Sequence, residues 1–314
     1  MKSARRKKFT KRWRSAHTPS KKTHIYGIFI KILVPLAIIL MAFLFVKIRT
    51  IYWNGYDKVA FTYRMDGGDV GVTIADPKLE ELTTLIIPGD TEVDVAENYG
   101  TLRLKNVWQL SQNEKLKGRL LPETVTQNFL FPVHLWADVG AVSLIDQSIM
   151  GTVKFVFSPS VTNIPFGDRV SLAMFALRAS SLGRSEINLG ESQFLKKQKL
   201  NDGEIGYILN GPISQRLTVY FSDNDLSVTA SKINIVDATG TPDVAIKVGE
   251  IIEVMGGKVV SVEKKGEESS DCEVSGKDKA IVKKVITLFS CKSGIVKSDF
   301  DLEIRLGQNF AKRF

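Results

Sequence analysis

The chain has 314 residues, a formal net charge of +9 at pH 7 and only two cysteines. Ten of its 43 Lys and Arg lie in residues 1–24, which contain no Asp or Glu, so the rest holds 33 basic against 34 acidic side chains. This balance argues against nucleic-acid binding, which needs basic residues clustered on the folded part. Two of the three histidines lie in the basic tail, so no Cys and His cluster supports a zinc site.

Residues 25–46 predict one transmembrane helix. The segment IYGIFIKILVPLAIILMAFLFV carries a single charge, Lys31, and its length of roughly 33 Å suits a hydrocarbon core of about 30 Å. The basic tail before it predicts a cytoplasmic N-terminus, with the remainder of the chain extracytoplasmic. A cleaved signal peptide is the alternative, but such peptides have shorter apolar regions that end in small residues. We therefore expect an uncleaved, single-pass anchor in the cell membrane.

A connector at 47–56 leads to an exported α/β (α+β) region, which we divide into 57–230 and 231–314. The first half begins with strand, helix and strand patterns, the order typical of α/β domains. Its predicted strands are 57–65, 69–76 and 81–88, which form a meander, and its helices lie within 101–118 and 121–130, before a strand at 131–138.

Residues 139–230 have weaker patterns. We expect an extended segment at 151–160, a helix at 168–181 and strand pieces with turns over 187–210. The alternating segment QRLTVYFS at 215–222 is compatible with a strand or with the start of a helix. No site can be placed in this part of the sequence.

The C-terminal part predicts the order β-α-β-β-α-β, which is typical of a small split βαβ domain. Its first helix, at 241–257, has Thr241 as the expected cap and Pro242 at the first position. The other predicted elements are strands at 227–240, 258–265, 271–276 and 300–307 and a helix at 277–289.

Cys272 and Cys291 predict a disulfide, because both lie in the exported part, where such bonds persist. A strand that begins at Cys272 and a helix that returns before Cys291 bring the two residues to the same end of the domain. Closing a loop of about 20 residues stabilises a fold by roughly 3 kcal/mol. The alternative is a pair of buried free thiols.

His134 is the only imidazole of the exported part. It lies in the alternating run FPVHLWAD, and no G-x-S-x-G motif accompanies it. A packed or surface strand residue is therefore a better interpretation of His134 than a catalytic base.

Three segments in order, INIVDATGTPDVAIKV, VMGGKVVSV and DLEIRLGQNFA, resemble the LytR C-terminal domain family over residues 231–312. The resemblance implies an exported domain of the bacterial cell envelope. Residues 57–138 are similar to a degenerate LytR/CpsA/Psr catalytic region, through DVGVTIAD and LTTLIIPGDTEV. Members of that family transfer a polymer from a polyprenyl pyrophosphate carrier to peptidoglycan, using arginines and magnesium-binding aspartates. Asp69 and Asp90 fall on the acidic positions.

The departures from that family concern its arginines. Gly67, Gly68 and Gly89 stand where the resemblance places Arg, whose guanidinium makes bidentate contacts with phosphate. Losing such contacts costs several kcal/mol of transition-state stabilisation, or several powers of ten in rate. We therefore expect no catalytic residue and no cofactor; in an active enzyme, Asp69 and Asp90 would act and would hold Mg²⁺. Three arginines elsewhere are candidate replacements: Arg64, Arg103 and Arg119.

The sequence thus favours a membrane-anchored, non-catalytic envelope protein. Its expected partners are the bilayer and a cell-wall glycan such as peptidoglycan, a lipid-linked glycan or an envelope protein. One alternative is an active LytR/CpsA/Psr-type phosphotransferase. A second is a scaffold subunit of an envelope assembly or secretion complex.

Overall fold

The computed structural model describes residues 33–35, 37–39, 41, 52–144, 148–157, 161–179, 183–212, 215–229, 231–295 and 299–314. The chain forms two compact units, Met1–Lys47 and Ile48–Phe314. In the first unit the described residues are helical and expose large apolar side chains: Leu33, Val34, Ile38, Ile39 and Met41. The basic tail, most of the predicted span at 25–46 and residues 47–51 lie outside the described residues. Within the described ranges, no helix has both the length and the apolar character that a membrane crossing requires.

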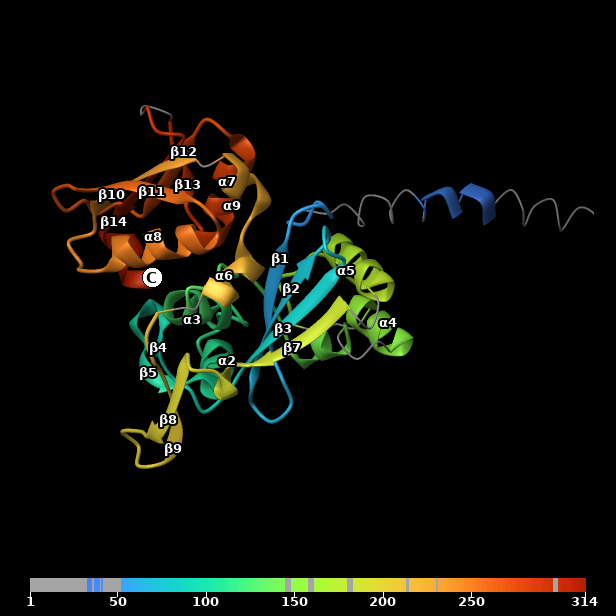
Figure 1. The fold of residues 1–314 in the computed structure, drawn as a ribbon. Helices are drawn as coiled ribbons and strands as arrows, with labels where there is room; N and C mark the ends of the chain where they lie inside the picture. The colour runs from blue at the N-terminus through green and yellow to red at the C-terminus, as the bar shows by residue number, and fades with distance from the viewer. Residues whose placement is uncertain are drawn as a thin grey trace, which may run out of the picture. The chain divides into compact units, whose positions relative to one another are not determined.

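The second unit has the mixed α/β structure that the sequence predicts, and its first sheet has the strand order β6-β1-β2-β3-β7 (Figure 1). The predicted meander is confirmed, because β1, β2 and β3 pair antiparallel in sequence order. The two outer strands pair parallel to their neighbours. The bounds are β1 Val59–Arg64, β2 Val70–Asp76, β3 Glu81–Ile87, β6 Leu135–Ala137 and β7 Arg184–Asn188.

Helices cover both faces of this sheet (Figure 1). On one face, Val72 and Leu85 share a buried core with α2 (Leu104–Asn113) and α3 (Leu120–Phe129). On the other face, Phe61 and Tyr63 share a core with α4 (Ile149–Phe157) and α5 (Phe166–Arg178). Because successive side chains of a strand point to opposite faces, each strand contributes to both cores.

Hairpins, short helices and 3₁₀ turns make up the other described elements before the second sheet. The hairpins pair β4 with β5 and β8 with β9. The bounds are β4 Glu92–Val95, β5 Gly100–Arg103, β8 Leu195–Lys199, β9 Ile205–Leu209, α6 Gln215–Phe221 and α7 Asn224–Thr229, with 3₁₀ turns at Ala96–Asn98, Val139–Leu144 and Leu189–Glu191.

The second sheet has the order β11-β10-β14-β12-β13. The predicted element order β-α-β-β-α-β is confirmed, but the split arrangement is wrong, because β10 and β11 lie side by side and pair parallel. The order of elements along a chain does not determine the order of strands across a sheet. The bounds are β10 Lys232–Ala238, α8 Val244–Val254, β11 Lys258–Lys264, β12 Cys272–Gly276, α9 Lys279–Phe289, β13 Lys292–Ser293, β14 Leu302–Gly307 and α10 Gln308–Arg313. The boundary drawn between 57–230 and 231–314 stays a prediction.

The predicted disulfide is present. Cys272 opens β12, Cys291 follows α9, and their Cα atoms lie 4.9 Å apart. Both residues are buried in the core that α8 and α9 form with the second sheet. The bond therefore ties the end of α9 to a central part of this sheet.

The prediction of an extended segment at 151–160 is wrong, because Ile149–Phe157 forms α4. Its Val and Phe residues favour strands as isolated residues. Packing decides instead: Phe155 and Val156 are buried against the sheet, while Val153 and Phe157 remain exposed. This distribution is that of a helix with one buried face.

Other segments also differ from the prediction. The strand expected at 131–138 covers only Leu135–Ala137, and the ambiguous segment at 215–222 forms the helix α6. Helix α8 begins at Val244 rather than beside Thr241. Asp243 takes the cap position with φ of 67° and makes no side-chain cap hydrogen bond.

Candidate functional site

Asp69 and Asp90, the acidic positions of the resembled family, lie in neighbouring loops. Asp69 Oδ1 accepts a hydrogen bond from the amide of Gly89 at 2.8 Å. A Cβ atom placed on Gly89 would lie 2.2 Å from the carbonyl oxygen of Gly68, and Gly68 itself has φ of 96°. A Cβ atom does not tolerate a contact as short as the one at Gly89. Residues that carry a side chain also rarely adopt a φ like that of Gly68. Arginine therefore fits neither position in this backbone.

Asp90 is held by two cations, one at the end of β5 and one at the start of α2. Its Oδ1 lies 2.7 Å from Arg103 Nη1 and 2.6 Å from Lys105 Nζ. Hydrogen bonds from Lys105 and Arg103 lower the pKa of Asp90. Arg103 also donates to both carboxylate oxygens of Asp202, at 2.8 and 2.9 Å, and lowers the pKa of Asp202 to about 2. Two cations and two carboxylates thus neutralise each other.

The other two candidate arginines are engaged elsewhere. Arg64 lies 3.4 Å from Asp138. Arg119 pairs with Glu97 and with Glu123. Of the three candidates, Arg103 is the one that contacts Asp90.

The residues around Asp69 and Asp90 do not fit a magnesium site. Magnesium prefers an octahedron of oxygen ligands and free carboxylate oxygens. Here Oδ1 of Asp90 is shared by Arg103 and Lys105, and Oδ1 of Asp69 accepts the Gly89 amide. In the part of the chain that the structure describes, no group of three or more His, Cys, Asp or Glu is arranged to hold a metal ion.

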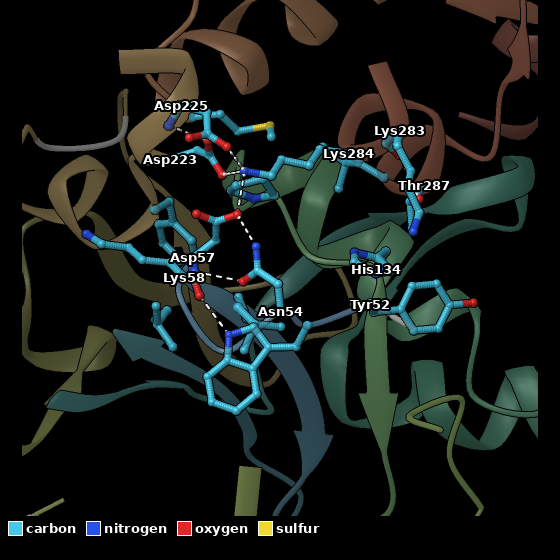
Figure 2. Close-up of a pocket in the computed structure, with 18 of the residues that line it drawn as sticks. Tyr52, Asn54, Asp57, Lys58, His134, Asp223, Asp225, Lys283, Lys284 and Thr287 are labelled. Atoms are coloured by element: carbon cyan, nitrogen blue, oxygen red, sulfur yellow. Dashed lines mark hydrogen bonds and ion pairs between the residues drawn. The ribbon is translucent and has the colours of Figure 1, made fainter. Parts of the chain in front are cut away.

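A different part of the molecule provides space for a ligand. Two cavities, of about 440 and 430 Å³, lie along α9 between the first and second sheets and share Tyr52, His134, Thr287 and Leu288. We call them together the α9 groove. The first cavity is lined by residues of α6 and α9 and by Tyr52, Trp53, Asn54, Asp57 and Lys58 (Figure 2). The second is lined by α3, the end of α9 and α10.

His134 and Tyr52 lie where the two cavities meet. His134 precedes β6, and its Nε2 is buried with no hydrogen-bond partner among the described residues. Burial lowers the pKa of His134 to about 4, so the imidazole is neutral at pH 7. The half-exposed Tyr52 ring lies edge-on to it, with 5.3 Å between the ring centroids. A neutral imidazole nitrogen can donate to or accept from a ligand hydroxyl.

Charged groups gather at the other end of the first cavity (Figure 2). Lys284 Nζ lies 2.9, 2.7 and 2.9 Å from carboxylate oxygens of Asp57, Asp223 and Asp225. Burial lowers the pKa of Lys284, but these hydrogen bonds outweigh it and raise the pKa above its ordinary value. Burial likewise opposes ionisation of Asp57, but hydrogen bonds from Lys284 and Asn54 lower its pKa overall. This cluster carries more negative than positive charge.

The second cavity contains a carboxyl group in an unfavourable environment. Burial raises the pKa of Glu123 to about 7, although the charge of Arg119 opposes this. Glu123 Oε2 is buried and has no hydrogen-bond partner among the residues described. Arg313 lies nearby on α10, donates to Asp271 at 3.0 Å and stacks on the Phe310 ring at 4.8 Å.

The sequence singled out His134 but not the groove around it. Tyr52, His134 and Lys284 come from segments that are far apart in the chain and that only tertiary packing brings together. The one signal in the sequence is that His134 is the only histidine after the predicted membrane span.

No family model and no curated protein matches the chain. Several solved structures are similar to about half of it. B. subtilis TagT is 12% identical with a TM-score of 0.36, over 52% of this chain and 89% of TagT. B. subtilis TagV is 11% identical with a TM-score of 0.36, over 50% and 92%. The LytR-CPS2A-psr family protein YwtF (TagT) with bound octaprenyl pyrophosphate lipid is 13% identical with a TM-score of 0.35, over 52% and 88%. At such low identities and TM-scores, these similarities carry no argument about activity or ligand.

Proposed function

We propose that this chain is a single-pass membrane protein whose extracytoplasmic part binds a cell-wall glycan in the α9 groove without catalysing its transfer. The observation that carries the proposal is the contact between the Gly68 and Gly89 backbones, beside Asp69 and Asp90. At position 89 the Gly68 backbone leaves no space for a side chain, and Gly67 and Gly68 have φ of 92° and 96°, which residues with a side chain rarely adopt. Ligand binding is then expected at the groove rather than at the two aspartates.

The charge balance around Asp90 supports the loss of catalysis. Transferring a phosphoryl group requires cations that are free to stabilise the charge that develops on phosphate oxygens. Arg103 makes two hydrogen bonds with Asp202 and one with Asp90. Binding a pyrophosphate would require Arg103 to leave these carboxylates, which would then lack their partner.

The α9 groove has the features of a glycan site. Sugar rings present apolar faces and many hydroxyl groups, so a site for them combines an accessible aromatic ring with polar groups. Tyr52 is 43% exposed and lines both cavities, and beside it lies the Nε2 of His134, which has no hydrogen-bond partner in the described part of the chain. The volumes of about 440 and 430 Å³ lie within the range of small-molecule sites.

The location proposed for the protein rests on the sequence and on two structural features. The apolar segment 25–46 follows ten basic residues, and its described side chains are exposed in the first unit. The Cys272–Cys291 disulfide suits an oxidising, extracytoplasmic compartment. Both features support a cytoplasmic N-terminus and an exported C-terminal part.

The test of binding is a calorimetric titration of the detergent-solubilised full chain with soluble peptidoglycan fragments. Tyr52→Ala removes the ring that both cavities share and should weaken binding at least about tenfold, which corresponds to roughly 1.4 kcal/mol. Tyr56→Ala is the matched control, because Tyr56 is 78% exposed and lines neither cavity. Equal affinities for the two variants would rule out the groove as the glycan site.

A phosphotransferase is the second candidate, because Arg103 and Lys105 both contact Asp90. In such an enzyme Arg103 would release Asp202 and would then take the role of the arginines that are glycines in this chain. It requires magnesium-dependent binding of a polyprenyl pyrophosphate to the full chain. If a calorimetric titration with the lipid gives no heat of binding, either with or without Mg²⁺, this candidate is excluded.

A further inference from the structure

Helices α4 and α5 expose a set of large apolar side chains that the proposed glycan site does not use. The six are between 47% and 78% exposed: Ile149, Met150, Val153, Phe157, Met174 and Leu177. We call this set the α4–α5 face. Single exposed apolar residues are common on proteins, but a group on two neighbouring helices marks an interaction surface.

The α4–α5 face follows from how the two helices pack. On α4, Phe155 and Val156 point into the core beneath the sheet, which leaves Val153 and Phe157 on the outer side. The Phe157 ring meets Phe166, at the start of α5, with 5.9 Å between the centroids. The two helices lie side by side on one face of the first sheet (Figure 1).

The charges on these helices have one sign at the surface. Lys154 and Arg178 are exposed, and α4 contains no acidic residue. The one acidic residue of α5, Asp168, is fully buried. Among the described residues of α4 and α5, this apolar surface carries exposed cations and no exposed carboxylate, which complements anionic lipid headgroups.

The connector that leads from the predicted membrane span is attached to α5. The amides of Tyr52 and Trp53 donate to the Asp168 carboxylate at 3.0 and 3.4 Å. The Trp53 ring packs on Phe175, with 5.6 Å between the centroids. Residues 47–51 are all that separates Tyr52 from the span at 25–46, and five extended residues reach at most about 18 Å. Chain length alone therefore keeps α5 close to the bilayer surface.

We propose that the α4–α5 face docks onto the outer surface of the membrane in which the chain is anchored. The apolar side chains enter the boundary between headgroups and acyl chains, and Lys154 and Arg178 meet anionic headgroups. This inference rests on the proposed membrane anchor but not on the glycan site. It holds or fails independently of what the α9 groove binds.

The test measures how close α4 lies to lipid. The native cysteines form a disulfide, so Met150→Cys gives the full chain a single reactive thiol for a fluorophore. The protein is reconstituted into phosphatidylethanolamine and phosphatidylglycerol vesicles that contain spin-labelled lipid as quencher. The matched control is Val228→Cys on α7, which is 83% exposed. We expect several-fold stronger quenching at Met150; equal quenching at the two positions would overturn docking.

A second variant separates docking from anchoring and from self-association. Val153→Glu with Phe157→Glu places two charges on the α4–α5 face, so quenching at Met150 should fall to the level of the control while the protein still floats with the vesicles. Unchanged quenching would contradict the proposal. Protein that does not float with vesicles would refute the anchor itself. Energy transfer between labelled copies at high lipid-to-protein ratio, without lipid quenching, would assign the face to a second copy.

Discussion

The carbonyl oxygen of Gly68 lies where a side chain of residue 89 would have to begin, since a Cβ on Gly89 would be 2.2 Å away from it. The turn between β1 and β2 thus contacts the segment after β3 through backbone atoms. Lys105 also packs against Gly89, because the Cβ of Lys105 lies 2.9 Å from the place that a Cβ on Gly89 would occupy. The packing of the two loops therefore leaves no space for an arginine side chain at position 89. The absence of arginine there is a structural property as well as a difference in sequence.

Gly89→Arg should destabilise the protein rather than restore a phosphate clamp. The new side chain must displace the Gly68 backbone, and such overpacking costs about 3 kcal/mol or more. Gly266→Arg is the matched control, because nothing lies within 4 Å of a Cβ at that position. Urea unfolding of both variants measures the effect; equal midpoints would contradict the close approach at Gly89.

Asp90→Asn should weaken the ion cluster without abolishing binding of glycan. Asp90 is 45% exposed, so the loss of its charge contacts with Arg103 and Lys105 costs about 1 kcal/mol at low salt. Salt screens such exposed contacts, so the difference from the unsubstituted chain should shrink at high ionic strength. Denaturant unfolding at two salt concentrations gives this comparison, and a loss of glycan affinity in the folded variant would argue against a groove remote from Asp90.

Lys284→Met should destabilise the protein strongly at neutral pH. It leaves the carboxylates of Asp57, Asp223 and Asp225 close together without their shared cation, a change that costs about 3 kcal/mol for buried groups. The exposed Lys279→Met on the same helix is the control for loss of a charge. Denaturant unfolding of both variants at pH 7 measures the difference, and equal midpoints would contradict the cluster.

The ionisation of Glu123 should lower the free energy of unfolding as the pH rises. Its pKa is raised from the ordinary 4.5 to about 7 by burial, so the folded state binds the proton more tightly than the unfolded state. The favourable contribution is complete below pH 4.5 and is lost as the pH rises through about 7.

Glu123→Gln removes this titration. The variant should match the unsubstituted chain near pH 4.5 and exceed its stability at pH 8 by up to about 3 kcal/mol. Glu186→Gln, at an exposed position on β7, is the control. Denaturant unfolding across this pH range decides the point, and a Glu123→Gln curve parallel to that of the unsubstituted chain would exclude a raised pKa.

Replacing both Cys272 and Cys291 by Ala should lower the free energy of unfolding by about 3 kcal/mol, as the loop of roughly 20 residues predicts. Thermal unfolding of the double variant beside the oxidised chain measures the difference. Stability equal to that of the oxidised chain would show that the bond adds nothing to the packing of β12 and α9.

The first three strands could be predicted because turn residues separate them and because the first and third alternate between apolar and polar residues. Helix α4 could not be predicted, because its Val and Phe residues suit a strand locally and only the position of Phe155 in the core shows which pattern applies. Local sequence patterns therefore predict the three-stranded meander, but they do not show that the α4 segment forms a helix rather than a strand.

The candidate site likewise has features that the sequence predicts and features that it does not predict. The resemblance implies that Asp69 and Asp90 belong to one site, and the positions of the strand at Cys272 and the helix before Cys291 predict the disulfide. The partner of Arg103, Asp202, lies on the distant β8–β9 hairpin, and the α9 groove needs Lys284 to meet Asp57. Contacts over such separations depend on packing that no local pattern records.

The most direct test of the account combines binding and transfer in one reaction. The full chain in lipid nanodiscs is incubated with Mg²⁺, a radiolabelled glycan on a polyprenyl pyrophosphate carrier and a soluble peptidoglycan fragment as acceptor. Separation of the products then shows whether the label stays on the lipid or moves to the fragment. We predict that the fragment is retained by the protein, in a manner that Tyr52→Ala weakens, and that no label reaches it. Label transfer that disappears in folded Asp90→Asn protein would contradict the account and establish an enzyme.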